Sequence, residues 1–276
     1  MGSVGTVARV SGLAYYPVKG FRAVPVQAAD VVETGLVDDR QYMVVDASDG
    51  SFISQRKVPA MAAASAAFVD GGLLLSMDGL DDHLVETTLD GAARDVSMFN
   101  KWYGTGIDQG DQAAKWCSAA LDREVRLVRF PPTQIRDGWG LHPGRVAFGD
   151  AHAILLITEA SLEGLNTRIT AAGAPAVPMD RFRPNIVLTG WPAHAEDEAT
   201  RLRIGAVELG FSTRAIRCAV PTVDQATGAK TGPEPTRTLA TYRRDPDRPG
   251  VSFGAKYAVL TPGPLHLGDE AQVVEG

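Results

Sequence analysis

Short apolar segments separated by glycine-containing turns recur along this chain and constrain its fold more than any single motif. In the second half these segments are NIVLTG, RLRIGAVELGFST, AIRCAVPTV, YAVLTPG and LHLGDEAQVVE, between residues 185 and 275. A doubly wound α/β sheet requires helices that alternate with strands, and too few helical patterns lie between these segments. We therefore expect a mainly β fold with peripheral helices (α+β), in which short strands form a barrel.

The first half shows the same preference for strands. Strand patterns occur at VARVSGLAYYPV, QYMVVDASDGSFISQ, GLLLSM and HLVETTL, between residues 7 and 89, and Asp49-Gly50 in the second of these is a strong hairpin signal. Helical periodicity is limited to residues 111–122 and to the segment that starts at Thr158, a good N-cap, and closes at Gly173.

The chain is longer than a usual single domain, because it has 276 residues. A Pro- and Gly-bearing region at 130–145 is typical of a loop, and we place a domain boundary just ahead of it. This divides the chain into an N-terminal domain, 1–125, and a C-terminal domain, 126–276. The polar segment 224–237 is predicted to be a mobile surface loop.

Charge and cysteine content exclude several classes of protein. The net charge of −6 argues against a dedicated nucleic-acid binder, although residues 181–256 carry 12 Lys/Arg against 8 Asp/Glu. The two cysteines lie too far apart in sequence for a local disulfide framework or a C-x-x-C site. No basic leader precedes an apolar run, and no segment approaches the roughly 18 apolar residues of a spanning helix. We expect a soluble cytoplasmic protein without a membrane anchor.

The two cysteines call for different interpretations. Cys117 falls on the apolar face of the helix predicted at 111–122, where a cysteine is usually a small buried hydrophobe. Cys218 follows Arg217 and lies near Arg214, and cationic neighbours favour a thiolate. Alternatively, Cys218 points into a barrel and the arginines point into solvent. The spacing alone leaves both possibilities open.

Several positions could hold an anion. Arg181 and Arg183 would lie on the same side of an extended segment, and paired guanidinium groups suit phosphate or carboxylate. Lys19 occupies a Pro-Val-Lys-Gly turn, and the helix N-terminus at Thr158 to Ser161 presents free N–H groups. Each feature also has a structural explanation, such as an exposed strand edge. With Arg217 they could describe a pocket for a phosphorylated ligand beside a thiolate.

Common catalytic and nucleotide-binding signatures are missing from the sequence. It contains no G-x-G-x-x-G after a strand, no P-loop, no G-x-S-x-G elbow and no His pair at i, i+4. Nucleotide binding by those motifs, serine hydrolysis and a helix-borne zinc site therefore have no local support.

Five motifs occur in an order that resembles a known family. They are YYPVKG, RQYMVVD, ITEASLEGLN, RFRPNIVLTG and IRCAVPTVD, between residues 15 and 224. In this order and spacing they resemble MOSC-domain proteins that carry an N-terminal MOSC β-barrel, especially bacterial relatives of the mitochondrial amidoxime reducing component. The resemblance covers nearly the whole chain and implies an N-terminal MOSC β-barrel domain followed by a MOSC β-barrel domain.

The resemblance also implies a cofactor and a reaction. The family binds molybdenum cofactor and reduces N-hydroxylated compounds, so Cys218 would be the molybdenum ligand and catalytic centre, and a soft thiolate suits that role. The positions matching those that hold the pterin and phosphate are Lys19, Arg40, Thr158, Ser161, Arg181, Arg183, Asn185 and Arg217, and Phe182 could pack on the pterin or on the core. The expected substrates are N-hydroxylated or N-oxide compounds. Because the sequence ends without a cysteine cluster, we expect a separate electron donor of ferredoxin, flavoprotein or cytochrome type.

Three residues depart from the family pattern. Gly20 replaces a common serine, Ala215 a frequent second cysteine, and Pro221 a common threonine. Two other functions stay open: a carrier of molybdenum cofactor or a related phosphorylated ligand, and Cys218-dependent sulfur transfer.

Overall fold

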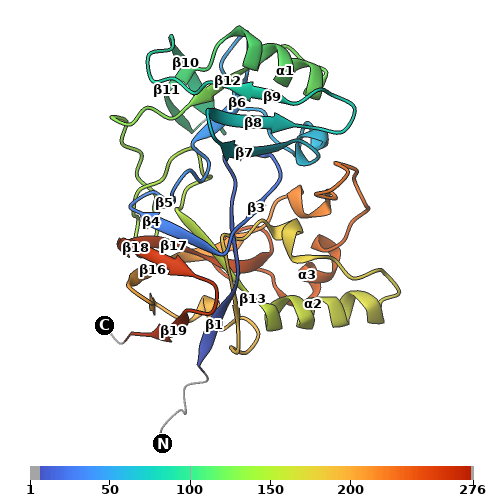
Figure 1. Ribbon diagram of the computed structural model, residues 1–276. Helices are drawn as coiled ribbons and strands as arrows, with labels where there is room; N and C mark the ends of the chain where they lie inside the picture. The colour runs from blue at the N-terminus through green and yellow to red at the C-terminus, as the bar shows by residue number, and fades with distance from the viewer. Residues whose placement is uncertain (1–6, 100, 275–276) are drawn as a thin grey trace, which may run out of the picture.

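The computed structural model describes residues 7–99 and 101–274, and Figure 1 shows two β-rich lobes, one above the other. Within the described residues, the lower lobe is a closed barrel of seven strands. Their order is β14 (Ile186–Thr189), β13 (Ile154–Thr158), β17 (Ser252–Thr261), β16 (Val207–Ile216), β15 (Arg201–Ile204), β19 (Glu270–Val273) and β1 (Ala8–Tyr15). The pairing of β1 with β14 closes the barrel, and the β13–β14 pair is parallel. The expectation of a mainly β fold is confirmed.

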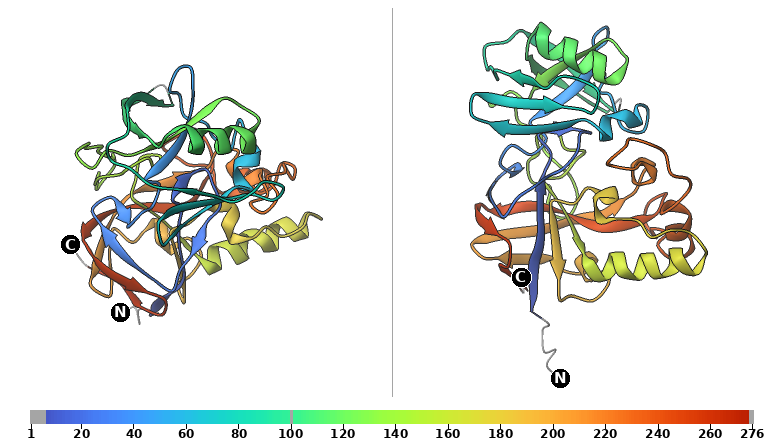
Figure 2. Two further views of the ribbon diagram at one scale, coloured as in Figure 1. Left: turned by 45° about the horizontal axis from the view of Figure 1, so that its top comes forward. Right: turned by 45° about the vertical axis from the view of Figure 1, so that its right-hand side comes forward.

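The barrel is filled by apolar side chains from alternate positions of its strands. Leu156, Leu202, Leu209 and Tyr257 are fully buried in this core. On the outside lie α2 (Glu159–Ala171) and α3 (Thr236–Tyr242), which Figure 2 shows on one side of the barrel. A sheet of β4 (Ala28–Val32), β5 (Gly35–Leu36) and β18 (Gly263–His266) and the short β3 (Val24–Pro25), paired with β1, complete this lobe.

Among the described residues, the upper lobe contains two sheets and one α-helix. The first sheet has the order β10 (Ala93–Met98), β11 (Trp102–Asp108), β12 (Val125–Arg129), β6 (Tyr42–Asp46) and β2 (Val18–Lys19). The second has the order β7 (Ser65–Val69), β8 (Gly72–Ser76) and β9 (His83–Val85). Helix α1 (Asp111–Leu121) packs its apolar face on this lobe, and Cys117 is completely buried there, as expected.

Strand pairing does not follow the proposed division at residues 125 and 126. The first strand, β1, lies in the barrel between β14 and β19, and the chain enters the upper lobe only at β2. The barrel therefore contains residues from both proposed domains. This arrangement brings Lys19, which directly follows the crossing, to the junction of the two lobes.

Two local predictions need correction. The segment 215–223 is not one strand: β16 ends at Ile216 and is followed by the 3-10 helix η4 (Val220–Thr222). Pro221 lies in η4, and it lacks the N–H that a strand ladder needs. At Asp49-Gly50 the chain turns as expected, but the returning arm forms only isolated bridges, including Val45 with Phe52.

Three further 3-10 helices occur, η1 (Pro59–Ala62), η2 (Met179–Phe182) and η3 (Ala195–Asp197). None of the helices in the described residues has the length and apolar character needed to cross a membrane.

Candidate functional site

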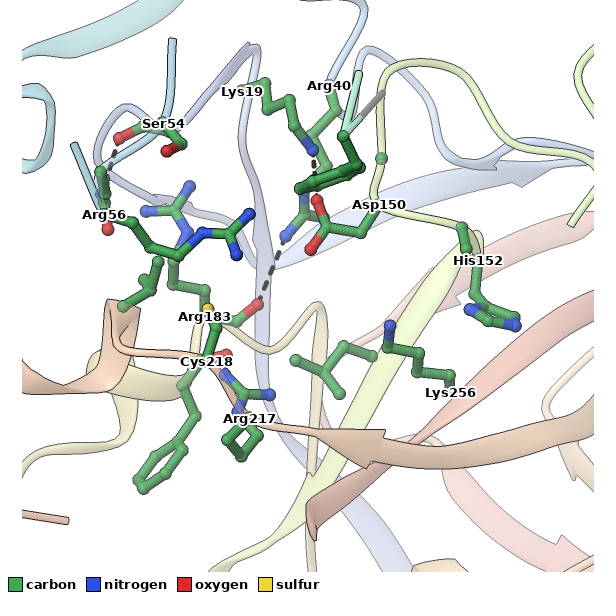
Figure 3. Close-up of a pocket in the computed structure, with 18 of the residues that line it drawn as sticks. Lys19, Arg40, Ser54, Arg56, Asp150, His152, Arg183, Arg217, Cys218 and Lys256 are labelled. Carbon is green, nitrogen blue, oxygen red and sulfur yellow. Dashed lines mark hydrogen bonds and ion pairs between the residues drawn. The ribbon is translucent and has the colours of Figure 1, made fainter. Parts of the chain in front are cut away.

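A pocket lies at the junction of the two lobes, and Figure 3 shows its lining in close-up. The upper lobe contributes Lys19, the segment 52–56 and Phe99, and the barrel contributes the loop 149–152 together with residues near the ends of its strands. Cys218 follows β16, is exposed, and belongs to the lining. Neither lobe alone forms this pocket.

The pocket lining is strongly cationic although the chain as a whole is acidic. Its acidic side chain is Asp150, whereas its basic side chains are Lys19, Arg40, Arg56, Arg183, Arg217 and Lys256. Positive charges this close together repel one another, and a bound anion relieves that repulsion. The lining therefore favours an anionic ligand.

Lys19 is held in place by a carboxylate and two aromatic rings. It lies on β2 beside β6, is 7% exposed, and forms an ion pair with Asp150. Its ammonium nitrogen lies 5.2 Å from the centre of the Phe52 ring and 5.6 Å from that of Phe99. Burial lowers the pKa of Lys19, while Asp150 opposes this effect. Although desolvation acts to raise the pKa of Asp150, the charge of Lys19 holds it well below its usual value.

Arg40 and Arg183 share one buried aromatic support, Tyr16, which the sequence analysis did not single out. Their guanidinium carbons lie 4.2 Å and 4.3 Å from the centre of the Tyr16 ring. Both arginines have left-handed backbone conformations, with φ of 50° and 60°. Arg183 precedes a proline, which disfavours the right-handed helical conformation at that residue. Burial lowers the pKa of Arg183 to about 10, and nearby Arg40 adds to the effect.

Asn185 joins Arg40 to the barrel. Its side-chain oxygen accepts hydrogen bonds from Arg40 Nη1 at 3.0 Å and from the backbone N–H of Leu155 at 3.2 Å. Its amide nitrogen donates to the carbonyl of Ala14. The predicted residue therefore lines the pocket and also fixes the position of one of its arginines.

Two buried glutamines join the lobes beside Arg183. Gln225 Oε1 accepts from Arg183 Nη1 at 3.0 Å and from Gln55 Nε2 at 3.1 Å, and Gln55 also donates to the carbonyl of Gly20. Gln225 is 4% exposed, so the segment 224–237 is not entirely a surface loop. Its polar composition gave no sign of this buried residue.

Arg217 lies beside Cys218, just after the last residue of β16. Its Nη2 donates to the carbonyl of Phe182 at 2.8 Å, and its Nε is buried without a hydrogen-bond partner among the described residues. Burial lowers the pKa of Arg217. Phe182 is fully buried and packs on Phe253 at 4.3 Å between ring centres, so its ring belongs to the core behind the pocket.

Arg181 does not join the pocket, because residues 179–182 form η2 instead of the extended segment we expected. Its side chain forms an ion pair with Asp224 at 3.0 Å and donates to Thr231 Oγ1 at 2.7 Å. The turn at Arg183 sends the two guanidinium groups to different partners.

Thr158 and Ser161 also lie outside the pocket lining. Thr158 is the N-cap of α2, as predicted, and accepts from the N–H of Ser161 at 3.2 Å. Both hydroxyl groups donate to the carboxylate of Glu196, at 3.1 Å and 2.8 Å, and the N–H of Thr158 points to the same group. The donors at the helix N-terminus are therefore occupied by the carboxyl group of a buried side chain of this chain.

Among the residues of the pocket region that the sequence did not indicate are Tyr16, Arg56, Asp150 and Lys256. Tyr16 directly precedes the Pro-Val-Lys-Gly turn, so its position was a usable signal. Nothing in the local sequence distinguished Arg56, Asp150 and Lys256 from ordinary surface charges.

Comparison with known proteins assigns both halves of the chain. Residues 7–124 match the MOSC N-terminal beta barrel domain, and residues 143–272 match the MOSC domain. Mitochondrial amidoxime reducing component 2 of Bos taurus is 34% identical, with 95% of this chain and 82% of the bovine protein covered. Mitochondrial amidoxime-reducing component 1 of Homo sapiens is 33% identical, with 96% and 82% covered, and that of Xenopus laevis is 32% identical, with 94% and 80% covered. The chain thus belongs to the family of MOSC-domain proteins that includes the amidoxime reducing components.

Proposed function

We propose that this protein is a molybdenum-cofactor-dependent reductase of N-hydroxylated or N-oxide compounds, with Cys218 as the metal ligand. The observation that carries the proposal is the placement of the exposed Cys218 thiol in a pocket whose lining has six basic side chains and one carboxylate. A thiolate is a suitable ligand for a soft metal site, and basic side chains are suitable for a phosphate.

The residues present fit the cofactor. The unpartnered Nε of Arg217 and the excess of cations leave donors available for an anionic group. The pterin and phosphate would be held by Lys19, Arg40, Arg183, Asn185 and Arg217, and we leave Thr158, Ser161 and Arg181 in the structural roles described above. When bound, the cofactor supplies the two-electron chemistry, while the protein orients it and controls access.

The proposed reaction breaks an N–O bond. An amidoxime takes up two electrons and two protons and yields an amidine and water. The electrons would come from a separate ferredoxin, flavoprotein or cytochrome. The cytoplasm is the proposed location.

The test compares the two cysteines. The parent, Cys218→Ala and Cys117→Ala are produced in a host that makes molybdenum cofactor, and molybdenum and oxidised-pterin fluorescence are measured per folded chain. Turnover of benzamidoxime is then followed with reduced methyl viologen as the donor. We expect Cys218→Ala to lose turnover and molybdenum but retain part of the pterin, since the phosphate and pterin contacts remain. The buried Cys117 provides the matched control.

Other outcomes separate the competing functions. A parent without metal and pterin contradicts the cofactor assignment, and full activity in Cys218→Ala contradicts the ligand assignment. A loaded parent that turns over no amidoxime would favour a carrier, and a persulfide on Cys218 would favour sulfur transfer.

A further inference from the structure

The six basic side chains of the pocket differ in whether they have a hydrogen-bonding partner in the protein. Lys19, Arg40, Arg183 and Arg217 each form a hydrogen bond or ion pair with a protein group. Among the described residues, Arg56 and Lys256 have no such partner. The first four match positions that the family resemblance assigns to the cofactor, whereas Arg56 and Lys256 have no assigned role.

Lys256 is fixed at its backbone and free at its ammonium group. On β17 it lies between Leu155 of β13 and Thr213 of β16, so strand pairing on both sides holds its Cα. Its side chain lines the pocket, where burial lowers its pKa; Asp150 opposes this effect, and the nearby charges of Arg217 and Lys19 add to it. A ligand anion beside Lys256 would oppose this effect and favour the charged ammonium.

Arg56 approaches from the other lobe. The preceding residue, Gln55, is 2% exposed and is hydrogen-bonded to Gly20 and Gln225, which fixes the chain at this point. The Arg56 side chain is exposed, and its guanidinium carbon lies 5.2 Å from the centre of the Phe99 ring. In Figure 3 Arg56 enters the pocket from the left and Lys256 from the right.

We propose that Lys256, assisted by Arg56, binds an anionic group of the substrate, so that the preferred N-oxygenated substrates carry a carboxylate. The inference rests on the proposed function. Phe52 and Phe99 also line the pocket, with Phe99 beside Arg56, and provide apolar surface for a planar ring. An aromatic N-hydroxylated carboxylic acid has both an anionic group for Lys256 and a planar ring for the apolar surface.

The test uses two substrates that differ in one charge, benzamidoxime and 4-carboxybenzamidoxime. For each of the parent, Lys256→Met, Arg56→Gln and Lys57→Met we measure molybdenum content, kcat and KM. Lys57 is an exposed neighbour of Arg56 outside the pocket lining, so Lys57→Met is a control for the loss of one charge.

We expect the parent to prefer the carboxylated substrate, and Lys256→Met to lower that preference in kcat/KM by about tenfold, as for the loss of one charge-assisted hydrogen bond. The kcat/KM for benzamidoxime, taken per bound molybdenum, should fall much less than that for 4-carboxybenzamidoxime. Arg56→Gln should lower the preference less, and Lys57→Met should not alter it. In calorimetry on the loaded protein, benzoate should bind more tightly than benzamide, and Lys256→Met should remove the difference.

Three results would overturn the inference. If the parent reduces both substrates equally well, the charge preference is absent although the proposed function stands. If Lys256→Met loses molybdenum, Lys256 belongs to the cofactor contacts. A loaded parent that reduces neither substrate overturns the proposed function and this inference with it.

Discussion

The inter-lobe pocket and the N-terminus of α2 are both rich in groups that bind anions, but only one of them is available to a ligand. At α2 the donors of Thr158 and Ser161 meet the carboxylate of Glu196, which is completely buried. In the pocket, the lining contains one carboxylate, Asp150, and six basic side chains. Donors therefore indicate a ligand site only where the chain does not supply the counter-anion itself.

The two regions also differ in what stabilises them. At α2 burial raises the pKa of Glu196, and the hydrogen bond from Ser161 opposes this effect, so the protein's own donors offset part of the cost of desolvation. In the pocket, burial lowers the pKa values of Lys19, Arg183 and Arg217, and an external anion would offset that cost. The following variants test this difference.

Arg183→Ala should have the largest effect, on cofactor content. Hydrogen bonds to charged groups contribute about 1.5–3 kcal/mol, which corresponds to about 10–150-fold in affinity. We expect a loss of that size in retained molybdenum and pterin, measured per folded chain after dialysis. Thr158→Ala should keep parental loading. Equal losses in the two variants would contradict the distinction between the regions.

Glu196→Ala should instead affect stability. It leaves the donors of Thr158 and Ser161 without their partner, so we expect the free energy of unfolding to fall by about 1–3 kcal/mol in urea denaturation. Cofactor content per folded chain should not change. The exposed Glu198 provides the control, because Glu198→Ala should leave stability nearly unaltered. A loss of loading in folded Glu196→Ala would connect α2 to the cofactor after all.

Tyr16→Leu should have a smaller effect on loading than Arg183→Ala. It removes the ring that supports Arg40 and Arg183, and cation–π contacts are worth about 0.5–2 kcal/mol. Tyr16→Phe keeps the ring and loses only the hydrogen bond to the carbonyl of Pro184, so it should load close to the parental level. If the two variants load alike, the ring does not position the arginines.

The smallest predicted effect concerns two histidines, one near each region. Burial lowers the pKa of both His152, which lines the pocket, and His194, which lies near α2, to about 4. Both unfolded histidines bind protons below pH about 6.5, so stability falls as the pH decreases from there toward 4. An anion in the pocket should raise the pKa of His152 alone. NMR titration of apo and loaded protein measures this, and equal shifts at both histidines would place the anion elsewhere.

The sequence determined those features that depend on neighbouring residues. The alternation of apolar and polar residues between turns predicted the strands, and Thr158 and Gly173 marked the ends of helix α2. The motifs around Lys19 and Cys218 indicated the family. The error at Arg181 arose because η2 and the left-handed turn at Arg183 replaced an extended segment. Phe182 of η2 packs on Phe253 of β17, a contact between segments distant in sequence that local pattern does not predict.

Only the tertiary structure decided which charged groups meet. Lys19 and Asp150 lie 131 residues apart in the chain, and Glu196 meets Ser161 across 35 residues. The sequence around Lys256 is that of an ordinary strand lysine, and pairing with β13 and β16 brings it into the same pocket as Arg217 and Cys218. Backbone preferences depend on a few neighbouring residues, so they can be predicted from the local sequence. The balance of charge in the pocket depends on residues from segments that are distant in sequence. It is therefore set only when strand pairing closes the barrel and the two lobes come together.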